Sequence, residues 1–241
     1  MSIHRFTYPD AKAAAEACAR SILARLETAT AGAGSATLAV SGGSSPVSMF
    51  QALAREKFDW SRVHLFWVDE RAVPPTDSQS NYKLVDDHFI SVAHFPRRNV
   101  HRVEGEMRPD EAARRYSDET RSFFGLGPSD LPHFDVIHRG VGTDAHTASL
   151  FPGEPLIDER EGIAAAVWVE KMSQWRITLL PSVLRAARNT VVLAAGADKA
   201  QAVRDVFEEP YDPKRFPAQL GLHDGRAVTW FMDEAAVRLV G

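Results

Sequence analysis

Short apolar segments alternate with amphipathic segments along nearly the whole chain of 241 residues. Apolar runs separated by helical patterns are typical of parallel strands that are buried on both faces. We therefore predict an α/β fold with a mainly parallel, doubly wound sheet and helices on both faces. Strands are expected at residues 36–40, 63–68, 134–137, 163–169, 176–180, 190–195 and 227–231, and helices at 10–27, 46–55, 82–90, 109–124, 181–187, 197–207 and 234–240.

The pattern predicts a single domain over residues 1–241, because Pro and Gly clusters near 125–132 and 210–217 look like internal loops. No apolar stretch is long enough to span a bilayer, and the polar, acidic N-terminus does not resemble a signal peptide. We expect a cytoplasmic protein without a membrane partner, as a monomer or weak dimer. The lone cysteine, Cys18, excludes an intrachain disulfide and a cysteine-based zinc site, and we expect it to be buried in a helix.

The charge balance limits the partners. Lys and Arg total 28 against 32 Asp and Glu, which gives a formal net charge of −4. There is no strongly basic field to attract nucleic acid, so we expect no nucleic-acid partner. An anionic ligand would have to meet positive charge gathered locally in one cleft.

Three polar turns follow predicted strands, at the sheet edge where open α/β sheets bind their ligands. The first contains Gly42, Gly43 and Ser44, directly before Pro46. Glycines permit close approach of the backbone to a ligand, and a helix start offers free amide hydrogens, so this turn suits a phosphate. The alternative is a purely structural tight turn. The P-loop and dinucleotide patterns are both missing, so ATP and NAD are not implied.

The second turn contains Asp69 and Arg71, and Asn81 follows after a proline-stiffened loop. The guanidinium of Arg71 is planar and permanently charged, which suits a phosphate or carboxylate. We count Asp69 and Asn81 with it as candidate substrate-binding residues. The alternative is a surface ion pair among Asp69, Glu70 and Arg71.

The third turn is rich in glycine and contains His146. A histidine in such a turn can act as a general base near neutral pH, and Asp144 can orient its imidazole. The alternative is an ordinary loop histidine. Lys171, Arg176 and Lys199 are candidates to reach the same cleft, although each alone is most simply a solvated charge. The chain has no Gly-x-Ser-x-Gly elbow and no His-Glu-x-x-His, so neither a serine nucleophile nor a metal is expected.

Six stretches carry a family resemblance: SGGSSP (41–46), WVDERAVPPTDSQSNY (67–82), GVGTDAHTASLFPG (140–153), WRITLLPSVLRAA (175–187), AAGADKAQAV (194–203) and VTWFMDEAA (228–236). They resemble the 6-phosphogluconolactonases, which share their fold with glucosamine-6-phosphate deaminases and ribose-5-phosphate isomerases. The third stretch separates these members. Deaminases carry a glutamate of their ring-opening machinery where this chain has Phe151, and a phenylalanine cannot shuttle protons.

The resemblance implies hydrolysis of 6-phospho-D-glucono-1,5-lactone to 6-phospho-D-gluconate in the oxidative pentose phosphate pathway, without metal or organic cofactor. It implies that His146 is the general base on water and that Asp144 orients it. The phosphosugar lactone would be bound by Gly42, Gly43, Ser44, Asp69, Arg71, Asn81, Lys171, Arg176 and Lys199. Two alternatives are a glucosamine-6-phosphate deaminase or phosphosugar isomerase on the same fold, and a non-catalytic phosphosugar-binding sensor.

Two places depart from the family pattern. Ala145 stands where the family usually has glycine, and if that position needs a positive φ, alanine costs about 1 kcal/mol. His138 and Arg139 replace residues that are usually apolar at the end of the preceding strand. We expect His138 to be either a hydrogen-bonded core histidine or part of the pocket rim.

Overall fold

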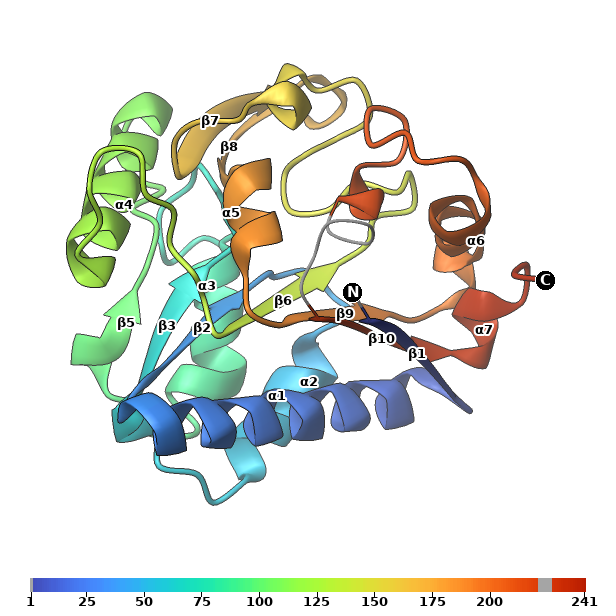
Figure 1. Cartoon of the computed structure of the whole chain (residues 1–241), viewed down its shortest axis with the longest axis horizontal. Coiled ribbons are helices and arrows are strands. Elements are labelled where there is room, and N and C mark those ends of the chain that lie inside the picture. Colours follow the sequence, from blue (N-terminus) through green and yellow to red (C-terminus); the bar gives the residue numbers. More distant parts are fainter. Residues whose placement is uncertain (1, 221–226) are drawn as a thin grey trace.

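Seven parallel strands form the central sheet of the computed structural model, which describes residues 2–220 and 227–241 (Figure 1). Their order across the sheet is β1-β10-β9-β6-β2-β3-β5, and every neighbouring pair runs parallel. The predicted α/β class with a mainly parallel sheet is confirmed. The strands are β1 (Ser2–Tyr8), β2 (Ala36–Val40), β3 (Val63–Trp67), β5 (Val100–His101), β6 (Val136–Gly140), β9 (Thr190–Ala194) and β10 (Ala227–Asp233).

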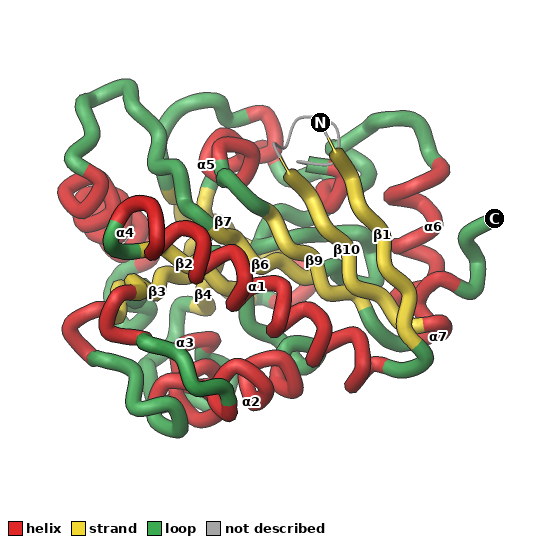
Figure 2. Tube along the Cα trace, turned by 60° about the horizontal axis from the view of Figure 1, so that its bottom comes forward, coloured by secondary structure: helices red, strands yellow, loops and turns green. Residues whose placement is uncertain are grey.

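Helices cover both faces of this sheet, which explains why its middle strands are buried. Every residue of β2 and of β9 is buried. The helices α1 (Ala11–Ala33) and α2 (Val47–Arg55) lie on one face, and α5 (Pro181–Ala186) and α6 (Ala200–Glu208) lie on the other (Figures 1 and 2). The remaining helices are α3 (Asn81–Val85), α4 (Pro109–Phe124) and α7 (Glu234–Val237).

Local sequence signals set the helix ends. The Asp10 carboxylate accepts a hydrogen bond from the Ala13 amide at 2.8 Å and caps the start of α1. Gly34 ends α1 in the left-handed conformation, with φ of 83°. The helix therefore continues past its predicted end at residue 27, because the chain offers no effective stop before Gly34. The predicted bounds of α4 are confirmed, since Pro109 occupies its first turn and Gly125 ends it.

A second, antiparallel sheet corrects one part of the prediction. The segments expected as parallel strands at 163–169 and 176–180 instead form the hairpin β7 (Ala164–Val169) and β8 (Gln174–Leu179). The order of this sheet is β4-β8-β7, where β4 is Asp69–Arg71. The physical reason is the connection between the two long strands. It is far shorter than the dozen or more residues that a parallel crossover needs, so only a hairpin can form.

Other elements were missed or misplaced by the sequence patterns. The strand β1 is exposed along most of its length, so it has no apolar run to mark it. The strands β4 and β5 are too short to show a period. The predicted helix 82–90 turns into a π-helical segment at Asp86–Ile90. The predicted helix 234–240 ends at residue 237, and the predicted helix at 46 starts one residue later, with Pro46 at its cap.

The strand order gathers the polar turns at one edge. β2 lies between β6 and β3, so the turn after β2 and the turn after β6 leave the sheet side by side. The loop after β9 starts beside them, because β6 also pairs with β9. Cys18 is fully buried in α1, as expected, and burial raises the pKa of its thiol. No helix within residues 2–220 and 227–241 has the length and apolarity to cross a membrane.

Candidate functional site

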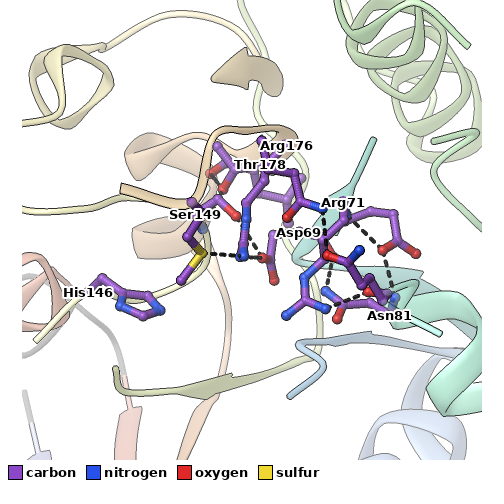
Figure 3. Close-up of polar contacts among 12 residues, drawn as sticks. Asp69, Arg71, Asn81, His146, Ser149, Arg176 and Thr178 are labelled. Carbon is purple, nitrogen blue, oxygen red and sulfur yellow. Dashed lines mark hydrogen bonds and ion pairs between the residues drawn. The ribbon is translucent and has the colours of Figure 1, made fainter. Parts of the chain in front are cut away.

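A polar cleft opens at the carboxyl edge of the parallel sheet. The turns after β2 and β6 form part of its wall, and β4, β8 and the start of α3 complete it. Nine of the eleven predicted site residues line it: Gly42, Gly43, Ser44, Asp69, Arg71, Asn81, His146, Arg176 and Lys199. The other two do not line the cleft: Asp144 contacts His146, and Lys171 contacts Asp144. Figure 3 shows the His146 ring on one side, Arg71 and Asn81 on the other, and Asp69 and Arg176 between them.

His146 and Asp144 form a close pair. Nδ1 of the imidazole lies 2.5 Å from Oδ1 of Asp144, and the same oxygen accepts a hydrogen bond from the His146 amide at 3.2 Å. The ammonium of Lys171 contacts the other carboxylate oxygen. Partial burial works to raise the pKa of Asp144, but the hydrogen bonds from His146 and Lys171 outweigh it and hold that pKa well below its usual value. Asp144 is therefore a carboxylate throughout the neutral range.

The walls around the imidazole leave it little freedom. The His146 ring stacks on Phe151 with ring centroids 4.2 Å apart. On its other side, a Cβ added at Gly142 would overlap the imidazole, so only glycine fits there. The Gly142 amide also donates to the carbonyl of His146 at 2.8 Å, which closes the turn. The ring position is thus fixed by packing as well as by Asp144.

Ala145 adopts the left-handed conformation, with φ of 62°. A non-glycine residue pays about 1–2 kcal/mol for this conformation. The methyl group is buried with Val141 and Trp230 in an apolar cluster, which offsets part of the cost. The departure from the family's glycine is therefore accommodated with strain in the turn that carries His146.

Three cations also line the cleft. Arg71 donates to the carbonyl of Gln79 at 2.5 Å, and Lys199 lies 3.3 Å from the Asp198 carboxylate. Arg176 is buried, and its guanidinium lies 4.0 Å from the Asp69 carboxylate. Burial lowers the pKa of Arg176, while Asp69 acts to raise it. These groups provide the locally gathered positive charge that a net-negative protein needs to bind an anion.

Gly42 and Asn81 pack directly against each other. A Cβ at Gly42 would overlap the Asn81 side chain, so glycine is required for this approach. The side-chain nitrogen of Asn81, Nδ2, donates to the backbone carbonyl of Asp69 at 2.8 Å. Its side-chain oxygen is buried and has no hydrogen-bond partner among the residues that the structure describes. This oxygen is therefore an unused acceptor on a residue that lines the cleft.

Three supporting residues were not predicted. The Ser149 hydroxyl donates to the Asp69 carboxylate at 2.8 Å, and the Ser149 amide donates to the Thr178 hydroxyl at 3.3 Å. Glu70, considered only as a surface ion pair, is buried and accepts four hydrogen bonds. All three lie in stretches that carry the family resemblance: Glu70 in 67–82, Ser149 in 140–153 and Thr178 in 175–187. Nothing in the sequence shows that Thr178, on β8, lies beside Ser149.

The structure decides the position of His138. It is a core residue beside Phe50 and does not line the cleft. Both of its ring nitrogens lack hydrogen-bond partners within the described part of the chain, so the expectation of a hydrogen-bonded core histidine is wrong in that respect. Burial lowers the pKa of His138 to about 3, which keeps the ring neutral. The neighbouring Arg139 is also buried, and donates to the carbonyl of Leu220 at 2.7 Å.

No cluster of three or more His, Cys, Asp or Glu side chains among residues 2–220 and 227–241 is arranged to hold a metal ion. The polar groups at the cleft instead form a histidine–carboxylate pair facing a group of cations. This arrangement suits proton transfer at a substrate that carries a phosphate or another anionic group.

A family model described as glucosamine-6-phosphate isomerases/6-phosphogluconolactonase matches residues 9–230. The chain belongs to this family. Within it, the chain is 32% identical over 216 residues to a 6-phosphogluconolactonase of Synechocystis, with 89% of each chain covered. It is 38% identical over 181 residues to the human 6-phosphogluconolactonase, covering 75% of this chain and 69% of the human one.

The family likeness extends to three dimensions. The crystal structure of a 6-phosphogluconolactonase from Shewanella baltica superposes with a TM-score of 0.84 at 26% identity, and 97% of each chain is covered. The resemblance expected from the six motifs is confirmed by these comparisons.

Proposed function

We propose that this chain is a hydrolase that converts 6-phospho-D-glucono-1,5-lactone to 6-phospho-D-gluconate in the oxidative pentose phosphate pathway. The family relatives that carry the name 6-phosphogluconolactonase support the reaction class. The observation that carries the mechanism is the 2.5 Å contact between His146 Nδ1 and Asp144 at a cleft lined by three cations.

In the proposed mechanism, His146 takes a proton from water as the water attacks the C1 carbonyl of the lactone. A proton on Nδ1, held toward Asp144, leaves Nε2 free to act as the base. The carboxylate of Asp144 then stabilises the imidazolium, and His146 returns the proton to the departing ring oxygen. A lactone is already an activated ester, so one positioned base is sufficient and no covalent intermediate is needed.

We assign the phosphate to the turn Gly42–Ser44 and to Arg71, Arg176 and Lys199, with Asp69 and Asn81 completing the binding site. Backbone amides of the glycine turns, or an arginine, would stabilise the tetrahedral oxyanion. Lys171 was expected to bind phosphate as well. Because its ammonium contacts Asp144 and lies 4.7 Å from the centre of the Phe151 ring, we assign it instead to holding Asp144 ionised.

Phe151 argues against the glucosamine-6-phosphate deaminase alternative. Its ring lies against the His146 imidazole, in the place where the deaminase pattern has a proton-transferring glutamate. The sensor alternative leaves the His146–Asp144 pair without a role. Both alternatives differ from the proposal in a measurable product: ammonia or a ketose in the first case, and no turnover in the second.

The direct test follows the loss of freshly prepared 6-phosphogluconolactone against the uncatalysed reaction. We expect clear acceleration by the wild type and a loss of about 100-fold or more in His146→Ala, the usual size of a general-base contribution. His4→Ala, at an exposed histidine of β1, is the matched control and should keep full activity. Acceleration that survives in His146→Ala would contradict the mechanism. A wild type no faster than buffer would contradict the enzyme itself.

A further inference from the structure

Glu70 is a buried carboxylate that the proposed mechanism does not use. Its side chain, on β4, is only 2% exposed. One oxygen accepts from the amides of Arg71 at 2.8 Å and Asn81 at 2.6 Å. The other accepts from the Tyr82 amide at 2.7 Å and the Ser80 hydroxyl at 3.1 Å. All four contacts come from donors, so the ionised carboxylate is the form that fits them.

These four donors belong to the two ends of one loop. Arg71 begins the loop after β4, and residues 80–82 end it at the start of α3. Glu70 thus joins the entry and the exit of a segment whose ends carry two cleft residues, Arg71 and Asn81. The loop is stiffened by prolines and is also held by the Arg71 contact with the Gln79 carbonyl and by the Ala72 amide, which donates to the carbonyl of Trp175.

We propose that Glu70 is a positioning residue, whose ionised carboxylate holds both ends of this loop together and so places Arg71 and Asn81 for binding of a phosphorylated substrate. The inference rests on the proposed function for the identity of that substrate. A consequence is that the affinity of the protein for the phosphorylated substrate falls when Glu70 is protonated. A protonated carboxyl presents an O–H toward groups that are themselves donors, so at least one of the four contacts is lost.

The surroundings of Glu70 bring this titration close to neutrality. Burial, with a smaller contribution from the neighbouring Asp69, raises the pKa of Glu70 to about 6 against the opposing effect of the backbone hydrogen bonds. The other charged group that acts on it is Arg176 on β8, whereas Arg71 and Tyr82 contact it through their backbone amides. A carboxyl group with a raised pKa stays protonated up to a higher pH than an exposed carboxyl group does. The loop should therefore loosen as the pH falls through about 6.

The experiment compares Glu70→Gln, an uncharged isostere, with Asp77→Asn, which removes the charge of a half-buried carboxylate in the same loop but keeps an oxygen to accept from the Gln79 amide. Values of kcat and KM for the lactone are measured between about pH 5 and 8, and binding of 6-phosphogluconate is measured by calorimetry at both ends of that range. The substrate phosphate also titrates near pH 6. Its contribution is the same for all three proteins, so it cancels in the ratio of variant to wild-type KM.

We expect Glu70→Gln to raise KM about tenfold at pH 7.5, the scale of effect that a small misplacement of binding groups produces. Its kcat should change far less, and the KM ratio should approach 1 near pH 5, where the wild-type residue is itself protonated. Asp77→Asn should match the wild type throughout. A lower melting temperature with unchanged KM, or a KM ratio that does not vary with pH, would overturn the proposal.

A measurement on the wild type covers the case in which Glu70→Gln does not fold. The Glu70 carboxyl is titrated by carbon-13 NMR with and without saturating 6-phosphogluconate. If the ionised form favours binding, the ligand must lower the pKa of Glu70 by reciprocal linkage. An unchanged or higher pKa would refute the idea. Ligand binding needs no turnover, so a failure here is distinct from a failure to hydrolyse the lactone.

Discussion

At the scale of single residues, the imidazole of His146 is held from three directions. Asp144 fixes one nitrogen, Phe151 lies against one ring face, and Gly142 leaves just enough room on another side. Each contact depends on a different property: charge, flatness and the lack of a side chain. In the proposed mechanism the imidazole must keep its geometry through proton transfer, so all three properties would bear on the reaction.

The variant Gly142→Ala tests how much the packing around the His146 ring contributes to kcat. The added methyl overlaps the imidazole, so His146 must move away from Asp144 while the charge of the site stays the same. We expect kcat to fall by about 100-fold, the size of effect reported for misplacement by about 1 Å. Circular dichroism and a melting curve establish that the variant folds. Gly32→Ala is the control, because a Cβ there meets nothing within 4 Å and Gly32 lies in α1, outside the cleft; equal losses in both variants would contradict the packing argument.

Most of the site residues could be predicted because they sit in turns after apolar strands. His146, Asp144 and Arg71 are of this kind. The contact between Asp69 and Ser149 could not be predicted, since 80 residues separate them and no periodic pattern links them. The place of Lys171 on Asp144 was also beyond the sequence, because it depends on the β7–β8 hairpin bringing its turn over the loop that follows β6.

At the scale of elements, the end of α1 allows a paired test of glycine chemistry. Gly32 lies inside the helix and Gly34 caps it, and a Cβ at either position would meet nothing within 4 Å. Gly34→Ala should lower the free energy of unfolding by about 1 kcal/mol, because alanine is strained at its φ of 83°. Gly32→Ala should raise it by up to about 1 kcal/mol through helix propensity. Urea unfolding measures both, and a shift of the same sign in the two variants would contradict this account.

The strands that were found from the sequence share one physical property. β2 and β9 are buried along their whole length and β3 at every residue except His64, so each is mainly apolar and visible as a run. The edge strand β1 is exposed and the strand β4 is short and charged, so neither leaves such a trace. The antiparallel pairing of β7 with β8 could have been predicted from the short connection between them. A connection of that length cannot join two parallel strands.

At the scale of the whole molecule, a net charge of −4 surrounds a cleft with three cations. The attraction of a phosphorylated substrate is therefore local and exposed to screening at the cleft mouth. We expect KM for 6-phosphogluconolactone to rise several-fold between about 0.05 and 0.5 M salt, as the Debye length falls below about 5 Å. Glucono-1,5-lactone, which lacks the phosphate, is the control substrate. The same salt dependence for both lactones would show that the cations do not bind the phosphate.

The two sheets carry different groups of the cleft. The parallel sheet ends in the loop that carries His146 and Asp144, whereas Arg71 and Arg176 stand opposite each other on β4 and β8 of the antiparallel sheet. Two of the three cations thus stand on the small sheet, while the histidine–carboxylate pair and the turn Gly42–Ser44 belong to the large one. Under the proposed mechanism, substitution of Arg71 or Arg176 would change which acidic sugar is accepted while the contact between His146 and Asp144 stays in place. A family with this layout can acquire new substrate specificities through the small sheet while it keeps the same histidine–carboxylate pair.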